Sequence, residues 1–288
     1  NSRVRPIVKD RHDNLWFGTE TGDIYKYNGK VLQKYGFSTL TKGGGFRSML
    51  MDKKGMRWSG ANGGGGLIKY DEKNFVQYTY GDGPTEINCM SVIEDKKSNI
   101  WIGTYEAGVK RTGKENYKNK KTTYKEFTQK EGLTSNKVLS VFEDSRENIW
   151  ICTEGGGVSK YDGTNLINYT EKEGLFCKSV TSVAEDKEGN IWLGTLGAGL
   201  CRFNGNNFDY YTVQQGLSHN NVWSVFEDSI GHLWAGTDKG LSLLIPQKDS
   251  IQNTKIQYAI YNFGFQDGMK AIDFNLHSFS IDKDDRIW

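Results

Sequence analysis

The sequence predicts an all-β fold, a β-propeller of four-stranded antiparallel blades, and three observations support this prediction. Seven of the eight tryptophans recur at one position of a long repeat, with steps of 42, 43, 49, 42, 42 and 54 residues between them. They are Trp16, Trp58, Trp101, Trp150, Trp192, Trp234 and Trp288. An Asp stands six residues before each one. The segments around them are short, β-rich and bounded by turn residues, which is typical of propeller blades.

One unit, residues 180–212, illustrates how a blade is encoded. Strands are predicted at 180–185, 191–195, 200–203 and 208–212. The first turn contains Asp186, Gly189 and Asn190, which bond nearby backbone or accept a positive φ. Trp192 lies in the second strand, and its indole is expected to fill the space between neighbouring blades. A connector over 213–220 leads to the next unit.

Six complete blades and the start of a seventh are predicted, all within a single domain that spans residues 1–288. Repeat arrays grow as one body, so the length of the chain does not divide it. The segment 276–288 repeats only an innermost strand and the beginning of the next strand. We therefore expect a seven-bladed ring closed by strands outside this chain, which would make the chain a fragment of a longer protein.

Composition argues against several classes of function. The net charge is +2 with acidic and basic residues interspersed, so no nucleic-acid binding through this chain is predicted. No apolar run approaches the length of a membrane span, so no membrane contact is predicted either. The four cysteines lack zinc-like spacing. They are interpreted as small core residues, with a disulfide or a reactive thiol as the alternative.

The repeated Asp is predicted to accept backbone N–H groups in the first turn of each blade. Calcium is the rival interpretation, because Asp186, Glu188 and Asn190 place oxygen ligands at alternate positions. The remaining acidic positions of a calcium loop are missing. No metal ion and no cofactor are therefore predicted.

The repeat resembles a known signalling repeat. Residues 140–162 read Ser-Val-Phe-Glu-Asp-Ser-Arg-Glu-Asn-Ile-Trp-Ile-Cys-Thr-Glu-Gly-Gly-Gly-Val-Ser-Lys-Tyr-Asp, and residues 131–138 read Glu-Gly-Leu-Thr-Ser-Asn-Lys-Val. Both are similar to the two-component regulator propeller repeat, and the resemblance covers essentially the whole chain. It implies the periplasmic sensor of a hybrid two-component regulator, with a histidine kinase and a DNA-binding regulator elsewhere in the polypeptide. Many sensors of that family detect breakdown products of complex glycans.

Ligand contacts are predicted where the units differ. Eleven residues before each repeated Trp stands a variable residue. These residues are Arg5, Arg47, Met90, Leu139, Thr181, Trp223 and His277. Closing the ring would gather the two arginines, the tryptophan and the histidine into one arc, which would suit a sugar bearing a carboxylate or sulfate. The alternative is that these side chains plug the channel or point into water.

The turn after the second strand and the connector before the innermost strand are predicted to share this face. They add six further candidate ligand-binding residues. These are Tyr105, Glu106, Glu154, His219, Asp238 and Lys239. Polar loop residues on a rigid scaffold are natural binding positions, although many are only solvated.

Together these features predict an extracytoplasmic ligand-sensing propeller of a hybrid two-component signalling protein, and not an enzyme. The signalling role rests on the resemblance alone. A small molecule or oligosaccharide would bind at the channel-mouth face and change how the propeller packs on an adjacent domain or a second protomer. The first alternative is a polysaccharide lyase or glycosidase that uses His219, His277 or the pair Glu106 and Glu154. The second alternative is a protein-interaction platform.

Overall fold

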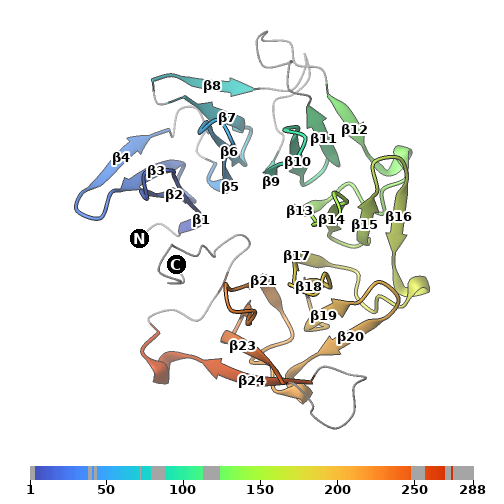
Figure 1. The fold of residues 1–288 in the computed structure, drawn as a ribbon. Coiled ribbons are helices and arrows are strands. Elements are labelled where there is room, and N and C mark those ends of the chain that lie inside the picture. Colours follow the sequence, from blue (N-terminus) through green and yellow to red (C-terminus); the bar gives the residue numbers. More distant parts are fainter. Residues whose placement is uncertain are drawn as a thin grey trace.

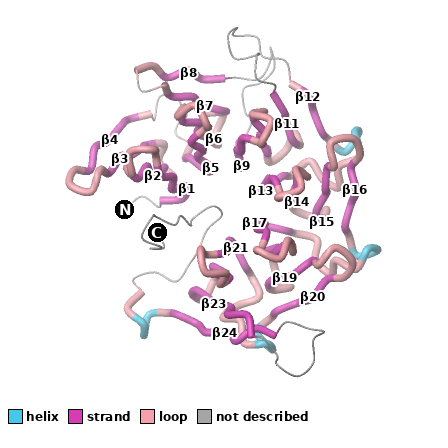
Figure 2. Tube along the Cα trace, viewed as in Figure 1, coloured by secondary structure: helices cyan, strands magenta, loops and turns pink. Residues whose placement is uncertain are grey.

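Six four-stranded antiparallel sheets, built from the described residues, stand around a common centre in the computed structural model (Figure 1). The structure describes residues 4–37, 41, 44–71, 73–78, 88–112, 124–247, 257–269 and 274. Regular structure in these ranges is almost entirely strand, with short 3₁₀ helices near the outer edge of the ring (Figure 2). Each sheet uses four consecutive strands, and its first strand is the innermost one.

The first three sheets follow one another around the ring. The first contains β1 (Val4–Lys9), β2 (Leu15–Thr19), β3 (Asp23–Tyr27) and β4 (Leu32–Gly36). The second contains β5 (Phe46–Met51), β6 (Arg57–Ala61), β7 (Gly66–Tyr70) and β8 (Phe75–Tyr78). The third contains β9 (Cys89–Glu94), β10 (Ile100–Thr104), β11 (Val109–Thr112) and β12 (Lys125–Phe127).

The next three sheets continue in the same direction. The fourth contains β13 (Val138–Glu143), β14 (Ile149–Thr153), β15 (Gly157–Tyr161) and β16 (Leu166–Tyr169). The fifth contains β17 (Val180–Glu185), β18 (Ile191–Thr195), β19 (Leu200–Phe203) and β20 (Phe208–Tyr211). The sixth contains β21 (Val222–Glu227), β22 (Leu233–Thr237), β23 (Gly240–Gln247) and β24 (Gln257–Phe263). The helices η1 (Gln129–Glu131), η2 (Glu171–Glu173), η3 (Val213–Gln215) and η4 (Phe265–Asp267) follow β12, β16, β20 and β24.

This architecture confirms the predicted propeller of four-stranded antiparallel blades. In the template unit only the fourth strand differs from expectation, since it ends at Tyr211. The reason is a capping box: the hydroxyl of Thr212 accepts the N–H of Gln214, and the side chain of Gln215 accepts the N–H of Thr212. The predicted start of a seventh blade, 276–288, lies outside the described residues, so the seven-bladed ring stays a prediction.

A hydrogen-bond network in the first turn ties the repeated Asp to the repeated Trp. In the fifth blade, Asp186 Oδ1 accepts the backbone N–H groups of Glu188 at 3.1 Å and Asn190 at 2.8 Å. Its Oδ2 accepts the indole N–H of Trp192 at 2.8 Å. The indole bond recurs at 2.8–2.9 Å in all six described blades. The predicted role of the Asp as a backbone N–H acceptor is confirmed, and the same carboxylate also orients the indole.

The tryptophans fill the space between blades, as predicted. Trp192 is fully buried, and its ring centroid lies 5.4 Å from that of Tyr211 in its own blade and 5.2 Å from that of Tyr258 in the next. Trp101 of the third blade likewise packs against Tyr161 of the fourth, at 5.9 Å. Such aromatic pairs add to the free energy gained from burial, so Trp101 and Trp192 each hold two adjacent blades together.

Small residues two positions after the Trp let adjacent blades approach closely. A Cβ atom on Gly103 would lie only 2.8 Å from Cγ1 of Val138 in the next blade. In the fourth blade Cys152 takes this position, and it is fully buried. The other three cysteines are also buried and free, which confirms their interpretation as core residues. Burial raises the pKa of the Cys89 thiol to about 12, far from that of a reactive thiolate.

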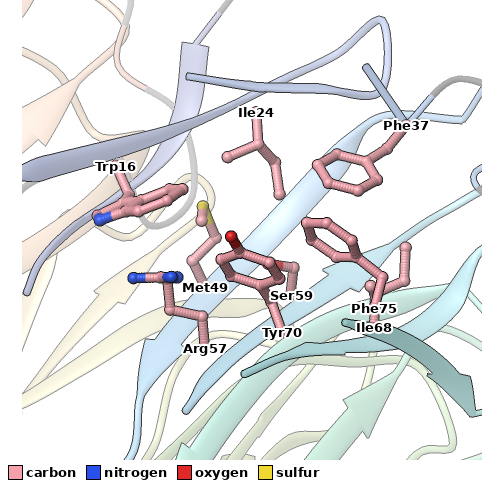
Figure 3. Close-up of a pocket in the computed structure, with 9 residues that line it drawn as sticks. All are labelled: Trp16, Ile24, Phe37, Met49, Arg57, Ser59, Ile68, Tyr70 and Phe75. Carbon is pink, nitrogen blue, oxygen red and sulfur yellow. The ribbon is translucent and has the colours of Figure 1, made fainter. Parts of the chain in front are cut away.

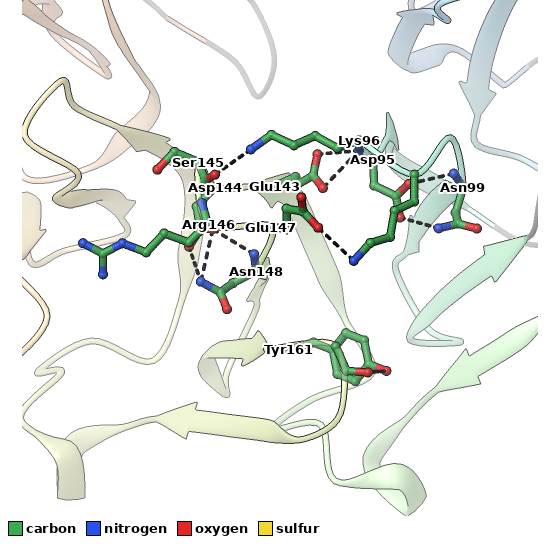
Figure 4. Close-up of polar contacts among 12 residues, drawn as sticks. Asp95, Lys96, Asn99, Glu143, Asp144, Ser145, Arg146, Glu147, Asn148 and Tyr161 are labelled. Carbon is green, nitrogen blue, oxygen red and sulfur yellow. Dashed lines mark hydrogen bonds and ion pairs between the residues drawn. The ribbon is translucent and has the colours of Figure 1, made fainter.

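A repeated Glu at the end of the innermost strand links each of the third to sixth blades to the blade before it (Figure 4). Glu143 of the fourth blade accepts the backbone N–H of Lys96 in the third, at 3.0 and 2.8 Å. Equivalent bonds join Glu94 to Lys53, Glu185 to Ser145 and Glu227 to Lys187. The second blade has Met51 here, and Arg11 instead donates from Nη2 to the carbonyl oxygen of Lys54 at 2.6 Å. This Glu therefore recurs because it joins blades.

The innermost strands surround a central channel (Figure 1). A cavity of about 230 Å³ in it is lined mainly by residues of β1, β5, β9 and β13. Ser48 Oγ accepts the N–H of Val92 at 2.9 Å, and Ser91 Oγ accepts the N–H of Val141 at 3.1 Å. These bonds join neighbouring innermost strands and fix their relative position around the axis.

Replacing Trp192 by Ala is expected to lower the free energy of unfolding by about 3–5 kcal/mol, because the substitution opens a cavity between two blades. Trp223→Ala is the matched control, since Trp223 is only half-buried, and it should cost less than about 2 kcal/mol. Urea unfolding followed by circular dichroism measures both. Equal losses in the two variants would contradict the inter-blade role of Trp192.

Replacing Glu143 by Ala is expected to destabilise the protein by about 1–2 kcal/mol, because the N–H of Lys96 loses its charged acceptor. Lys97→Ala is the control: it removes only the exposed ion pair with Glu147, which should contribute less than about 0.5 kcal/mol. Both values come from urea unfolding. If the Lys97 variant loses as much as the Glu143 variant, the inter-blade bond is not the stabilising contact.

Candidate ligand-binding face

The variable slot coincides with a β-bulge in the innermost strand of all six described blades. In the second blade, Phe46 pairs with Ala61 and Ser48 pairs with Gly60, which leaves Arg47 without a partner across the strands. The bulged residues are Arg5, Arg47, Met90, Leu139, Thr181 and Trp223. A bulge changes the direction of its side chain and removes it from the ladder. This slot can therefore vary while the flanking positions repeat.

The turn after the second strand lies beside the bulge. In the fourth blade, Glu154 donates its backbone N–H to the carbonyl oxygen of Lys137, two residues before the bulge, at 2.9 Å. Equivalent bonds run from Tyr105 to Asn88, from Leu196 to Ser179 and from Asp238 to Asn221, at 3.0–3.3 Å. The predicted sharing of one face by connector, innermost strand and turn is confirmed in these blades.

An arginine cluster, composed of Arg5, Glu20 and Arg47, lies where the first and second blades meet. Arg5 donates from Nε to Glu20 Oε1 at 2.7 Å, and from Nη2 to the same oxygen. Arg47 is half-buried near this pair. Burial, and then the positive charge of Arg5, lower the pKa of the Arg47 guanidinium. The structure thus brings the two predicted arginines together.

A tyrosine cluster, composed of Tyr105, Glu154 and Lys137, joins the third and fourth blades. Tyr105 donates its hydroxyl to Glu154 Oε2 at 2.7 Å, and this bond is the main reason why the pKa of Tyr105 is raised. Lys137 Nζ lies 3.3 Å from Glu154 Oε1 and 5.3 Å from the centroid of the Tyr105 ring. Both carboxylate oxygens of Glu154 are thus engaged by neighbours.

A tryptophan cluster, composed of Trp223, Asp238, Asn221 and His219, lies on the sixth blade. Asp238 Oδ1 accepts the indole N–H of Trp223 at 2.5 Å, and Oδ2 accepts a side-chain N–H of Asn221 at 2.7 Å. His219 Nδ1 lies 3.5 Å from Asp238 Oδ2 and accepts the backbone N–H of Asn221 at 3.1 Å. Because Nδ1 is an acceptor, a neutral His219 carries its proton on Nε2. Three predicted residues meet here.

The other predicted site residues lie elsewhere. Glu106 and Lys239 are exposed side chains of the turns. His277 lies outside the described residues. Leu139 and Thr181, at 5% and 0% exposure, are packed into the ring. Their burial leaves neither side chain exposed to a ligand at this face.

Three members of the clusters were not predicted from the sequence, namely Glu20, Lys137 and Asn221. A signal for Glu20 was available, because it stands four residues after Trp16, in a slot that varies between blades as the bulge slot does. Lys137 and Asn221 each stand two residues before a bulge. Their partners lie in the following turn, so only the folded blade shows the contact.

A small cavity between the first and second blades is a packing gap rather than a ligand site (Figure 3). Its volume is about 10 Å³, room for roughly one water molecule. Beside it the buried Arg57 stacks on two rings, with its Cζ 3.8 Å from the centroid of Trp16 and 4.4 Å from that of Tyr70. The contact with Trp16 joins two blades, and the contact with Tyr70 lies within the second blade.

Three segments of the chain, 132–155, 174–197 and 216–239, match a family model described as "Two component regulator propeller". Each runs from a connector through the innermost and second strands to the following turn, in the fourth, fifth and sixth blades. The chain carries the two-component regulator propeller repeat. The family resemblance derived from the sequence is thereby confirmed.

Solved structures share the fold of this chain. The extracellular domain of a hybrid two component system from B. thetaiotaomicron aligns with TM-score 0.84 and 24% identity, covering 100% of this chain and 37% of that one. A second such domain from the same organism aligns with TM-score 0.57 and 18% identity, covering 100% of this chain and 40% of that one. Virginiamycin B lyase from Staphylococcus aureus aligns with TM-score 0.73 and 11% identity, covering 92% of this chain and 85% of that one. At these identities the likeness shows the fold alone.

The propeller spans well under half of the two extracellular domains that it matches. Three of its blades match the repeat model, and its fold is similar to that of the matched extracellular domains of hybrid two-component systems. A search of curated proteins gave no match. Over the described ranges, none of the helices has the length and apolar character that crossing a bilayer requires.

Glu154→Ala is expected to lower the pKa of Tyr105 from its raised value, because the hydroxyl loses its carboxylate acceptor while Lys137 still lies over the ring. Titration of ring-labelled tyrosine by NMR measures the change. Glu106→Ala removes a neighbouring exposed carboxylate and should leave the pKa of Tyr105 unaltered. An unchanged pKa in the Glu154 variant would contradict the tyrosine cluster.

Proposed function

We propose that this propeller is the extracytoplasmic ligand-sensing part of a hybrid two-component signalling protein, and that it binds a glycan-derived oligosaccharide at the face formed by the bulges and turns. The supporting observation is that side chains from variable positions gather on that face into three polar clusters. The extracytoplasmic location is supported by the matching solved structures, which are extracellular domains.

The clusters supply the groups that recognise sugars. Carboxylates, amides and a histidine accept from and donate to hydroxyl groups, and aromatic side chains cover the apolar face of a pyranose ring. Trp223 is suited to this, since Asp238 fixes its indole while the side chain stays half-buried. The clusters lie in different blades around the channel mouth, so they would contact different residues of an oligosaccharide.

Binding at this face would act on signalling through the packing of the propeller. A ligand that contacts several blades would favour one arrangement of the propeller on an adjacent domain or a second protomer over another, by the difference in its affinity for the two. A kinase outside this chain would respond to that change. The chain itself would contact neither nucleic acid nor membrane, and would need no cofactor.

An enzyme is the second candidate, because virginiamycin B lyase shares the fold over 92% of this chain. His219 and Asp238 would be the reacting groups. His219 Nδ1 already accepts a backbone N–H, and Asp238 accepts from Trp223 and Asn221. We nevertheless propose no catalytic activity for this chain, and the turnover measurement described below tests that assignment.

Trp223→Ala and His219→Ala are expected to weaken oligosaccharide binding by about tenfold or more, as truncation of central contact residues commonly does. Calorimetry with a panel of plant and host glycan oligosaccharides measures the affinity. His232→Ala is the matched control, because this histidine lies 3.5 Å from Asp228 in the first turn of the same blade, at the opposite end of the strands. It should bind as the wild type does.

Other outcomes would overturn the proposal in distinct ways. Turnover of a glycan by the purified protein would favour the enzyme. Absence of any rise in melting temperature across the panel, together with capture of a defined protein partner, would favour an interaction platform. Equal losses in the His219 and His232 variants would place the ligand away from this face.

A further inference from the structure

The arginine cluster contains more positive charge than its own carboxylate balances. Arg5 is occupied by Glu20, and their side chains are 15% and 31% exposed. Within the described part of the chain, Arg47 forms no hydrogen bond and no ion pair, although it is half-buried. Arginine remains protonated under all ordinary conditions. Two guanidinium groups and one carboxylate therefore leave one positive charge uncompensated.

Residues of the first and second blades together position the arginine cluster. Gly45 approaches the turn of the first blade so closely that a Cβ atom on it would lie 2.4 Å from Glu20 Cα. Asn62 holds Gly45 in place by two hydrogen bonds. The side-chain Oδ1 of Asn62 accepts the backbone N–H of Gly45 at 2.6 Å, and the backbone N–H of Asn62 donates to the carbonyl oxygen of Gly45 at 3.0 Å. Arg47 follows two residues later, on its bulge. Its backbone is therefore fixed beside Glu20 and Arg5.

The two other clusters do not share this imbalance. In the tyrosine cluster, Lys137 is matched by Glu154, so the cluster is neutral. In the tryptophan cluster, Asp238 is surrounded by neutral donors and by His219, so this cluster is acidic when the histidine is neutral. Among the three clusters, an excess of positive charge is thus found only in the arginine cluster.

We propose that Arg47, oriented beside the Arg5–Glu20 pair, binds the monoanionic group of the ligand, a carboxylate or sulfate ester of an acidic sugar. The proposal rests on the function proposed above and adds the ligand class and its orientation. A half-buried guanidinium without a counter-ion costs free energy, and an oxyanion that accepts from its planar fork removes this cost. Arg5 is a positioning residue, since its guanidinium already donates to the carboxylate of Glu20.

Galacturonate and galactose test the proposal, because they differ only in the C6 carboxylate. Wild-type protein is expected to bind galacturonate and inorganic sulfate, and to bind galactose at least about tenfold more weakly, the difference that charge-assisted hydrogen bonds supply. Arg47→Gln should abolish the preference, and Arg47→Lys, which keeps the charge without the fork, should retain part of it. NMR of the arginine Nε–H groups reports which guanidinium contacts the anion.

Lys97→Gln is the matched control, because it removes a cation that already has a carboxylate partner, Glu147, in the Asp turns at the opposite end of the blades. It should retain the preference for galacturonate. Loss of the preference in both variants would show non-specific attraction by charge and overturn the proposal, as would an unchanged Arg47→Gln variant.

The two proposals fail differently. If the wild type binds neutral oligosaccharides at this face without preferring galacturonate, only the anion site is wrong. If galacturonate binds through Arg47 and no oligosaccharide binds at all, only the proposed sensing of oligosaccharides is wrong. Thermal unfolding of each variant verifies that it is folded.

Discussion

The structure depends on the hydrogen bond between the repeated Asp and the indole of the Trp six residues later. A tryptophan can be buried between two sheets only if its N–H has an acceptor, since an unsatisfied donor would cost part of the free energy gained by burial. The Asp provides this acceptor at 2.8–2.9 Å and closes the first turn with its other oxygen. The same few residues therefore shape a turn, orient a large ring and join two blades.

This interaction divides each blade into two ends with different constraints. At the end with the Asp turn, the carboxylate and the repeated Glu bond to backbone groups of the same or the preceding blade, so their identity is restricted. At the other end, the bulge takes one residue out of the strand ladder. Cross-strand pairing does not determine the side chain of that residue, so it varies, and at Leu139 and Thr181 it is buried in the ring.

The fold alone does not distinguish sensing from catalysis, since extracellular sensor domains and a streptogramin-type lyase both align with it. Any difference in function must come from side chains, and those at the bulge and turn vary between blades. There the carboxylates of Glu20, Glu154 and Asp238 are each engaged by neighbouring donors. Such preorganised groups suit recognition of a polar ligand. The three clusters also differ from one another in net charge.

By itself the sequence determined the blades, their strand boundaries, the buried tryptophans and the role of the Asp, because each depends on residues close together within one repeat. It also located the variable slots, from which Arg5, Trp223 and Asp238 were predicted. Only the tertiary structure decided which of these side chains meet. Glu20 reaches Arg5 across a hairpin, and Arg47 joins them from the next blade. Register, bulge direction and the close approach of Gly45 set these contacts, and none of the three is readable from spacing alone.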